Sequence, residues 1–148
     1  MTIPSADELE LAVASARALW DRDHASRALG ITLEEVRPGY ARTAMTIVQT
    51  MLNGHATAHG GMLFTLADST FALACNSRNV RNVALQCSIS FVAAVRLGDR
   101  VVAQAQECSR TGRTGVYDVT LVRGDDTVAL FRGVCYRVSG SVIGESPE

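Results

Sequence analysis

The sequence predicts one domain of the α+β class, in which an antiparallel β-sheet wraps around a central α-helix. Three observations lead to this prediction. The chain has 148 residues, a length typical of a single domain, and 47% of them are hydrophobic, enough for an ordinary core. Residues 62–75 form a segment that is apolar on nearly every side, as in a helix buried all round. Long strand-like runs separated by short turns fill the second half of the chain.

The N-terminal segment has the pattern of an amphipathic helix over about residues 5–28. Ser5 and Glu8 form a capping box, in which each side chain can bond to the backbone amide of the other residue. Apolar residues follow at helical spacing as far as Trp20, and the pattern fades by Gly30. We therefore expect a helix with a polar outer face at the start of the domain.

Strand-like runs lie on both sides of the central helix. Before it, a turn at residues 36–40 divides two runs, the second ending near residue 48. After it come runs over residues 83–95, 100–109, 116–123 and 127–138. A parallel crossover needs a dozen or more residues, so we expect these four runs to be antiparallel neighbours in chain order. Around an apolar helix, such a sheet curls. Residues 140–148 are expected to form a flexible tail.

Composition excludes several classes of function. The net charge is −1, which gives no basic footprint for nucleic acid. All 14 basic residues are arginine, so nucleotide-binding P-loops, pyridoxal Schiff bases and Ser–Lys pairs, which need lysine, are excluded. The chain shows no secretory signal pattern and no apolar run long enough for a membrane span. Its four cysteines form no metal motif. We expect a cytoplasmic protein, without membrane contact, whose reduced thiols are buried as small hydrophobes.

Asp68 is the most unusual residue of the sequence. It is the only charged residue between Gly60 and Ser77, and it lies in the middle of the apolar helix. An unpaired buried carboxylate costs several kcal/mol, so Asp68 must be paired, neutralised or placed at a wet cleft. One interpretation is a structural carboxylate bonded to Ser69 or Thr65. The other is a general base or covalent nucleophile.

Two glycines, Gly60 and Gly61, precede this helix. They permit a ligand to approach the first free amides of the helix, where the positive end of the helix dipole favours negative charge. Such amides could stabilise an oxyanion. The alternative is a flexible loop that enters a tightly packed helix.

The spacing of these two features sets a condition on the function. Gly60 and Asp68 are eight residues apart, which is about 12 Å along one helix. A carbonyl under attack must lie about 3 Å from both its nucleophile and its oxyanion donor. If both residues serve one reaction, two subunits must combine them, and a two-fold axis then creates two equivalent sites. The functional hypothesis requires at least a homodimer.

Other polar residues near the glycines offer weaker signals. His55 and His59 have a spacing that can bind zinc on a helix, but they precede the glycines in a loop and no third ligand is evident. We therefore expect no metal, and assign His59 to supporting the loop. Asn53 could donate a hydrogen bond in the cleft.

Four arginines lie in loops after the central helix and between strands, at Arg78, Arg81, Arg110 and Arg113. Solvated loop charge is one interpretation. The other is a phosphate-bearing substrate, because the guanidinium fork suits phosphate oxygens.

Residues 53–68, Asn-Gly-His-Ala-Thr-Ala-His-Gly-Gly-Met-Leu-Phe-Thr-Leu-Ala-Asp, closely resemble the hotdog-fold acyl-CoA thioesterases, within them the phenylacetate-degradation (PaaI-type) branch. Further stretches that resemble this branch are residues 74–77, 114–118 and 128–133. The resemblance extends from about residue 6 to 144. It implies a hotdog fold, which agrees with the α+β arrangement predicted above.

The resemblance also implies an activity and roles for residues. The activity is hydrolysis of acyl-CoA thioesters such as (hydroxy)phenylacetyl-CoA, without a cofactor. Asp68 matches the catalytic carboxylate and Gly60 the glycine whose amide polarises the thioester carbonyl. Asn53 and His59 match residues that support the site, and with Gly61 they are expected to contact the substrate. The family assembles its sites across a dimer interface and usually pairs dimers into a homotetramer. Arg110 and Arg113 become candidates for binding the phosphates of CoA.

Some alternatives stay open. Whether Asp68 attacks the carbonyl or activates water does not follow from the sequence. Some hotdog enzymes place a hydroxyl on the facing strand, where this chain has Ala84, Leu85 and Gln86. A hotdog hydratase or dehydratase is a second enzyme hypothesis, and a non-catalytic acyl-CoA-binding module is a third.

Overall fold

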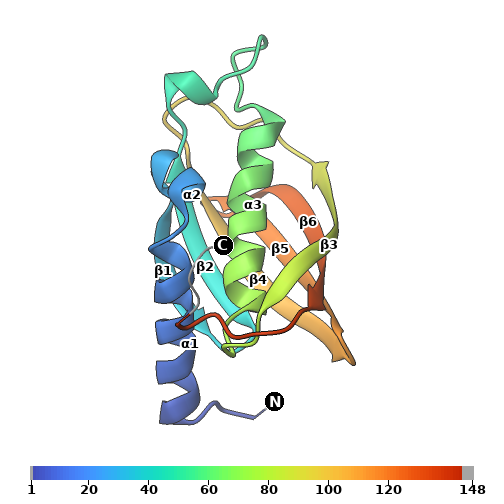
Figure 1. Cartoon of the computed structure of the whole chain (residues 1–148). Coiled ribbons are helices and arrows are strands. Elements are labelled where there is room, and N and C mark those ends of the chain that lie inside the picture. The colour runs from blue at the N-terminus through green and yellow to red at the C-terminus, as the bar shows by residue number, and fades with distance from the viewer. Residues whose placement is uncertain (1, 145–148) are drawn as a thin grey trace.

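The computed structural model describes residues 2–144 and confirms the α+β hotdog architecture. Six antiparallel strands form one sheet that curls around the central helix (Figure 1). The elements in chain order are α1 (Ala6–Trp20), α2 (His24–Ala28), β1 (Thr32–Arg37), β2 (Tyr40–Thr46), a 3-10 turn (Gln49–Met51), α3 (Gly60–Cys75), β3 (Asn82–Phe91), β4 (Arg100–Thr111), β5 (Thr114–Arg123) and β6 (Asp126–Arg137).

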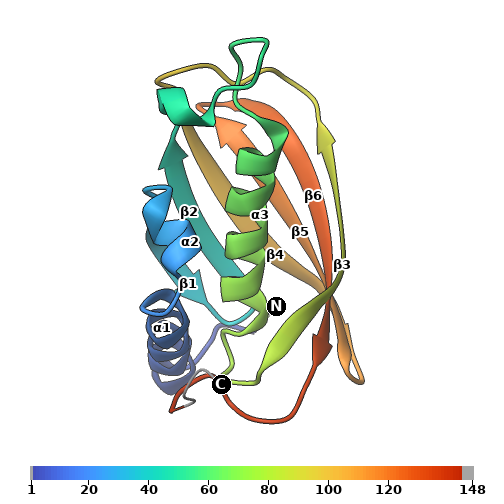
Figure 2. The ribbon, with the colours of Figure 1, turned by 45° about the horizontal axis from the view of Figure 1, so that its top comes forward.

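The strand order corrects one prediction. The order across the sheet is β1-β2-β4-β5-β6-β3, so β3 pairs with β6 and not with β4, its successor in the chain. Residues 92–99 instead cross the end of the sheet near the start of α3 (Figure 2). Backbone bonds hold this crossing at both sides: Val92 N donates to Val128 O at 2.9 Å, and Gly98 N donates to Ile47 O at 2.9 Å. The chain therefore places β3 at an edge of the sheet.

The N-terminal helix is broken rather than continuous over residues 5–28. The Ser5–Glu8 capping box starts α1 as predicted, but the helix ends at Trp20. Asp23 has non-helical dihedrals, and its side chain accepts from Ser26 N at 2.9 Å and from Ser26 Oγ at 2.6 Å. This N-cap begins α2, because an aspartate that bonds to the amide three residues later favours a new helix start.

Helix α3 fills the sheet but is not buried on every side. It packs against all six strands, and Leu66, Ala67 and Phe71 are at most 1% exposed. A buried bond of 2.7 Å between the hydroxyls of Thr43 and Thr70 ties it to β2. One stripe of the helix is only partly covered in the single chain: Gly61, Thr65, Asp68 and Ala72. These residues recur at helical spacing, so they form one continuous open face.

The thiols and the C-terminal residues differ in part from expectation. All four cysteines are free, and Cys75 and Cys135 are buried as predicted, but Cys108 is exposed. Residues 140–144 are held in place, since Val142 is 3% exposed and its amide donates to Asn79 Oδ1 at 3.0 Å. The remainder of the predicted tail, 145–148, lies outside the described residues. Among residues 2–144, no helix has the length and apolarity needed to cross a membrane.

Candidate active site

The loop before α3 is organised around Asn53. Its side-chain oxygen accepts from His55 N at 2.9 Å, and from the amide and hydroxyl of Thr57, each at 3.2 Å. Asn53 N donates to Thr57 O at 2.8 Å and closes the loop. The oxygen of Asn53 is therefore fully used within the loop. Its side-chain NH₂ donates to no group among residues 2–144, which leaves these hydrogens for a ligand.

His59 caps α3 and decides which backbone amide is free. Its Nδ1 accepts from Gly61 N at 2.9 Å, and its carbonyl accepts from Met62 N at 2.9 Å. In the described part of the chain, the amide of Gly60 has no hydrogen-bond partner. Since the positive end of the helix dipole lies at this amide, the geometry suits a negatively polarised oxygen. No group of His, Cys, Asp and Glu side chains suited to a metal occurs in residues 2–144.

A groove opens beside the Gly60 amide. Its volume is about 490 Å³, and it is lined by Asn53, Thr57, Ala58, Gly60, Leu63 and residues 91–95. The ring of Phe91 covers Gly60 so closely that a Cβ at Gly60 would lie 2.8 Å from Phe91 Cζ. Gly60 is thus required for close approach of this ring.

Asp68 lies on the open face of α3, and the hydroxyls proposed to bond it are engaged elsewhere. Ser69 Oγ is bonded to Ser26 Oγ at 2.6 Å, and Thr65 Oγ1 donates to Gly61 O at 2.9 Å. The structural interpretation of Asp68 therefore lacks its expected partners. The contact found for the carboxylate is the Cys87 thiol on β3, with a long Sγ–Oδ1 distance of 4.0 Å.

This environment disfavours the charged form of the carboxylate. Burial raises the pKa of Asp68, and the negative charge of Asp23 adds to the rise. Asp23 is linked to the helix beside Asp68 through Ser26 and Ser69, by the hydrogen bonds described above. A half-buried carboxylate with a raised pKa and little hydrogen bonding is available as a base or nucleophile.

The free amide and the carboxylate do not meet within one chain. Gly60 begins α3 and Asp68 lies two turns later on the same straight helix, a separation of about 12 Å along its axis. The single chain therefore holds a groove with a free amide at one end of α3 and, apart from it, a carboxylate in the middle of the open face of this helix.

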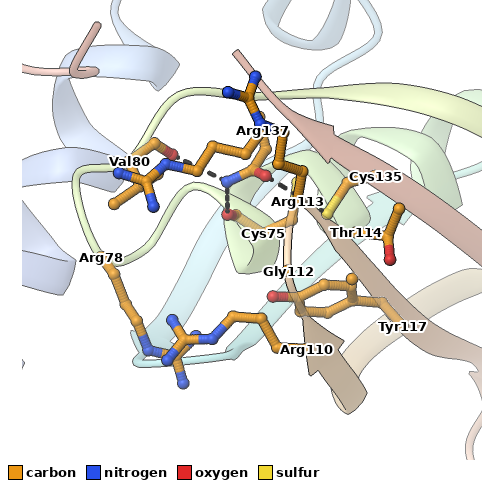
Figure 3. A pocket seen from close by; sticks show the side chains of 12 residues that line it. Cys75, Arg78, Val80, Arg110, Gly112, Arg113, Thr114, Tyr117, Cys135 and Arg137 are labelled. Atoms are coloured by element: carbon orange, nitrogen blue, oxygen red, sulfur yellow. Dashed lines mark hydrogen bonds between the residues drawn. The ribbon is translucent and has the colours of Figure 1, made fainter. Parts of the chain in front are cut away.

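A second cavity lies at the other end of α3, beside the loop arginines that the sequence offers as candidate phosphate ligands (Figure 3). Its volume is about 300 Å³, and its lining residues are Cys75, Arg78, Val80, Asn82, Arg110, Gly112, Arg113, Thr114, Gly115, Tyr117, Cys135 and Arg137. Arg78 and Arg110 extend toward each other on one side of the cavity. The structure thus brings Arg78, Arg110 and Arg113 together and adds Arg137 from β6.

The charges around this cavity are only partly balanced. Arg78 donates to Glu107 at 2.6 Å, and Glu107 also accepts from the Tyr117 hydroxyl at 2.6 Å. No carboxylate of residues 2–144 lies within ion-pair distance of Arg110, Arg113 or Arg137. The cavity therefore has positive charge in excess, which suits an anionic ligand.

Several residues at these sites escaped the sequence analysis. Phe91 and Cys87 lie on β3, and their positions against α3 depend on strand pairing between distant parts of the chain. Asp23 acts on Asp68 through a helix break that the hydrophobic pattern does not reveal. Arg137 carries no local signal apart from its charge.

Comparisons with known proteins agree with this architecture. Residues 55–130 match the family model of the thioesterase superfamily. The chain is 43% identical over 133 residues to "Acyl-coenzyme A thioesterase PaaI" of Escherichia coli K12, which covers 89% of this chain and 95% of that protein.

Two solved structures are also similar. The E. coli PaaI protein from the phenylacetic acid degradation operon superimposes with a TM-score of 0.89 at 41% identity, covering 90% of this chain and 98% of that one. The protein smu.793 of Streptococcus mutans, solved with bound acetyl-CoA, superimposes with a TM-score of 0.72 at 26% identity, covering 74% and 90% of the two chains.

Proposed function

Because this chain belongs to the thioesterase superfamily, we propose that it hydrolyses acyl-CoA thioesters at sites shared by two subunits. In each site, the Gly60 amide of one subunit binds the thioester oxygen and Asp68 of the other drives hydrolysis. One observation carries this proposal: an unbonded amide and a weakly bonded carboxylate lie on the same helix, too far apart to act on one carbonyl.

The amide of Gly60 supplies the oxyanion contact. When a nucleophile attacks the thioester carbon, negative charge develops on the carbonyl oxygen, and a donor fixed at a helix N-terminus stabilises it without rearrangement. The loss of one such donor typically raises the barrier by about 3 kcal/mol. The His59 cap supports this role, because it engages the neighbouring Gly61 amide and leaves Gly60 free.

Two roles of Asp68 are compatible with hydrolysis of the thioester. As a general base, it takes a proton from water, the water oxygen bonds to the carbonyl carbon, and the C–S bond breaks to release CoA thiol and acid. As a nucleophile, it forms an acyl-aspartyl anhydride with loss of CoA, and water then hydrolyses the anhydride. Single turnover in labelled water distinguishes them: label enters the Asp68 carboxylate only through the anhydride.

The shared site requires a homodimer, and β3 is the edge that supports one. Among residues 2–144, only β6 pairs with β3, so within this part of the chain the other edge of β3 is free to pair with a second chain. Its apolar side chains are exposed, with Leu85 at 63% and Val83 at 45%. A two-fold pairing at this edge would bring together the open faces of two α3 helices in opposite directions. In that arrangement Gly60 of each chain lies beside Asp68 of the other.

The groove beside Gly60 is the proposed acyl pocket. Phe91, Leu63 and Val92 give it apolar walls, and the NH₂ of Asn53 adds one polar donor. An aromatic acyl group such as phenylacetyl or hydroxyphenylacetyl fits such walls, because rings pack favourably against rings. The similarity to a protein of the phenylacetic acid degradation operon supports the same substrate class.

The arginine cavity is the proposed site for the phosphates of CoA. In the antiparallel pairing, Cys75 of the chain that supplies Asp68 lies about 10 Å beyond that carboxylate, past Gly60 of the other chain. The pantetheine arm can cover this separation, so Arg110 and Arg113 would hold the nucleotide end. The bound acetyl-CoA in smu.793 supports a CoA ligand for this fold.

A thiol-release assay on a panel of aromatic and straight-chain acyl-CoAs tests the proposal. We expect turnover, with the highest kcat/KM for aryl-acetyl esters, and an Asp68→Asn variant that loses about 10²-fold to 10⁴-fold in kcat while still binding substrate. Asp125→Asn, at the exposed β5–β6 turn, is the matched control. Binding without turnover by the unmodified protein would instead indicate a binding module, and hydration of an enoyl-CoA without thiol release would indicate a hydratase.

A further inference from the structure

Two of the four cysteines, Cys75 and Cys135, lie together at the wall of the arginine cavity (Figure 3). Cys75 is the last residue of α3 and Cys135 lies on β6, so the pair connects the central helix to the sheet. Their thiols are hydrogen-bonded to each other, and the two residues are 7% and 2% exposed. Neither thiol takes part in the proposed hydrolysis.

The surrounding residues hold the pair in this arrangement. The side-chain NH₂ of Asn82 donates to Cys75 O at 2.9 Å, and its side-chain oxygen accepts from Cys135 Sγ at 3.6 Å. Gly115, which pairs with Cys135 across β5 and β6, leaves room for the sulfur, since a Cβ on Gly115 would lie 2.9 Å from Cys135 Sγ. A disulfide requires two cysteine side chains that are directed toward each other, and this packing supplies such a pair.

The two thiols differ in acidity. The hydrogen bond from Cys75 lowers the pKa of Cys135. The same hydrogen bond, together with burial, raises the pKa of Cys75. The excess positive charge of the cavity also favours a thiolate over a thiol. Cys135 is therefore the nucleophile of the pair, and Cys75 is the thiol beside it.

The other two cysteines are less suited to oxidation. Burial and the charge of Asp68 raise the pKa of Cys87, and burial and a hydrogen bond with Asp118 raise the pKa of Cys108. The Cys87 thiol contacts Asp68, and the Cys108 thiol donates to Gln106 O at 3.6 Å. A low thiolate content makes a cysteine slow to oxidise, so we expect selectivity for the pair at the cavity.

We propose that Cys75 and Cys135 form an oxidation site for hydroperoxides, which converts the two thiols to an intramolecular disulfide at the wall of the arginine cavity. The Cys135 thiolate attacks the O–O bond, so that one oxygen is transferred to sulfur as a sulfenic acid and the other leaves as an alcohol or water. The Cys75 sulfur then displaces the transferred oxygen as water, and the S–S bond forms. The thiols lose two electrons to the hydroperoxide, and one thiol proton ends on each departing oxygen. The cavity, of about 300 Å³, gives a small peroxide access to the buried sulfurs.

Peptide mapping of the full chain after treatment with hydrogen peroxide tests this site. Because all 14 basic residues are arginine, trypsin places each cysteine on its own peptide: residues 43–78, 82–96, 101–110 and 133–137. We expect the treated protein to lose two of its four free thiols, and peptide 43–78 to be linked to peptide 133–137. Dithiothreitol should restore all four thiols. The proposal is overturned if the four thiols persist in excess peroxide, or if the linked peptides contain Cys87 or Cys108.

Substitutions test which thiol attacks. In Cys75→Ser, the sulfenic acid on Cys135 has no thiol to react with, so dimedone should label peptide 133–137. In Cys135→Ser, peptide 43–78 should stay unlabelled; a label there and none on 133–137 in Cys75→Ser would contradict the attack by Cys135. Cys108→Ser is the matched control and should form the same disulfide as the wild type. Circular dichroism verifies folding, and the wild-type mapping needs no variant.

One comparison connects the pair to the CoA site and rests on the proposed function. If the phosphates of CoA occupy the cavity, a thioether analogue of an acyl-CoA, which has no thiol and is not hydrolysed, should cover the two sulfurs. At ten times its dissociation constant, it should slow disulfide formation about tenfold. Equal rates with and without the analogue would contradict the placement of the phosphates in this cavity, whereas the linked peptides would still establish the oxidation site.

Discussion

The ring of Phe91, at the end of β3, lies directly against Gly60, the first residue of α3. A Cβ placed on Gly60 would stand 2.8 Å from Phe91 Cζ, closer than carbon atoms approach in folded proteins. This contact connects an edge strand to the free amide of the helix. It means that the position of the amide depends on a side chain 31 residues away in the sequence.

Gly60→Ala should therefore displace either the ring or the start of α3. A displacement of about 1 Å of the oxyanion donor can cost about 10²-fold in turnover. Phe91→Ala should relieve the clash, so the double variant Gly60→Ala/Phe91→Ala should recover the kcat of Phe91→Ala alone. Steady-state kinetics on one acyl-CoA compare the variants, and failure of the second substitution to rescue would show that the clash is not the cause.

The Phe91→Ala variant also allows the contribution of the Gly60 N–H to be measured separately from the clash with the ring. Proline is tolerated at the first position of a helix and has no N–H. Compared with Gly60→Ala/Phe91→Ala, the variant Gly60→Pro/Phe91→Ala should lose about 10²-fold to 10³-fold in kcat. Equal kcat for the two variants would remove the Gly60 amide from the mechanism.

The rate should depend on the ionisation of Asp68. Because burial and the charge of Asp23 raise the pKa of Asp68, activity should decline as the pH falls through that raised pKa. Asp23→Asn removes the negative charge and keeps a residue that can cap α2, so the acid limb should move to lower pH. The kcat/KM profile measures the shift, and Asp21→Asn is the control. An unchanged acid limb of the kcat/KM profile would show that the charge of Asp23 does not affect the ionisation of Asp68.

The same pKa predicts an effect on stability. A carboxyl group with a raised pKa in the folded state stabilises the fold below its unfolded pKa, and this stabilisation is lost as the pH rises through the folded pKa. At neutral pH, Asp68→Asn should therefore unfold at a higher temperature than the wild type. The difference should shrink toward acid pH. If Asp68→Asn unfolds at a lower temperature than the wild type at neutral pH, the charged form of Asp68 has a favourable partner in the folded protein.

The arginine cavity should affect KM more than kcat. Arg110→Glu and Arg113→Glu should each raise KM for acyl-CoA by about tenfold, the loss of one charge-assisted phosphate contact. KM for the corresponding acyl N-acetylcysteamine thioester, which has no phosphate, should not change. Arg27→Glu on the exposed side of α2 is the control. Equal effects on both substrates would discard the phosphate role.

The sequence was most informative where one residue breaks a uniform pattern. A single charge in an apolar run identifies Asp68, and two adjacent glycines identify the start of α3, where the structure has Gly60. Local signals such as the Ser5–Glu8 box also predict the first helix start. In each case the deciding interaction lies within a few residues in the chain.

The sequence was least informative where distant segments decide the structure. The short link at residues 97–99 suggests a hairpin between β3 and β4. In the sheet, however, β3 lies at an edge, three places from β4, and the order of the strands along the chain does not reveal this. Strand pairing depends on contacts across the whole sheet, which local patterns do not encode. For the same reason the approach of Phe91 to Gly60 could not be predicted.

The central claim, that two chains complete each site, can be tested by mixing two inactive variants. One chain carries Asp68→Asn and the other carries Gly60→Pro with Phe91→Ala; each alone is expected to be inactive. After co-refolding at equal amounts, half of the dimers are hybrids, and each hybrid has one site with an intact amide and an intact carboxylate. We expect recovery of about one quarter of the wild-type activity, because the intact site of each hybrid takes both Gly60 and Phe91 from the Asp68→Asn chain. Hybrids that form, as native mass spectrometry would show, yet hydrolyse no acyl-CoA would contradict it.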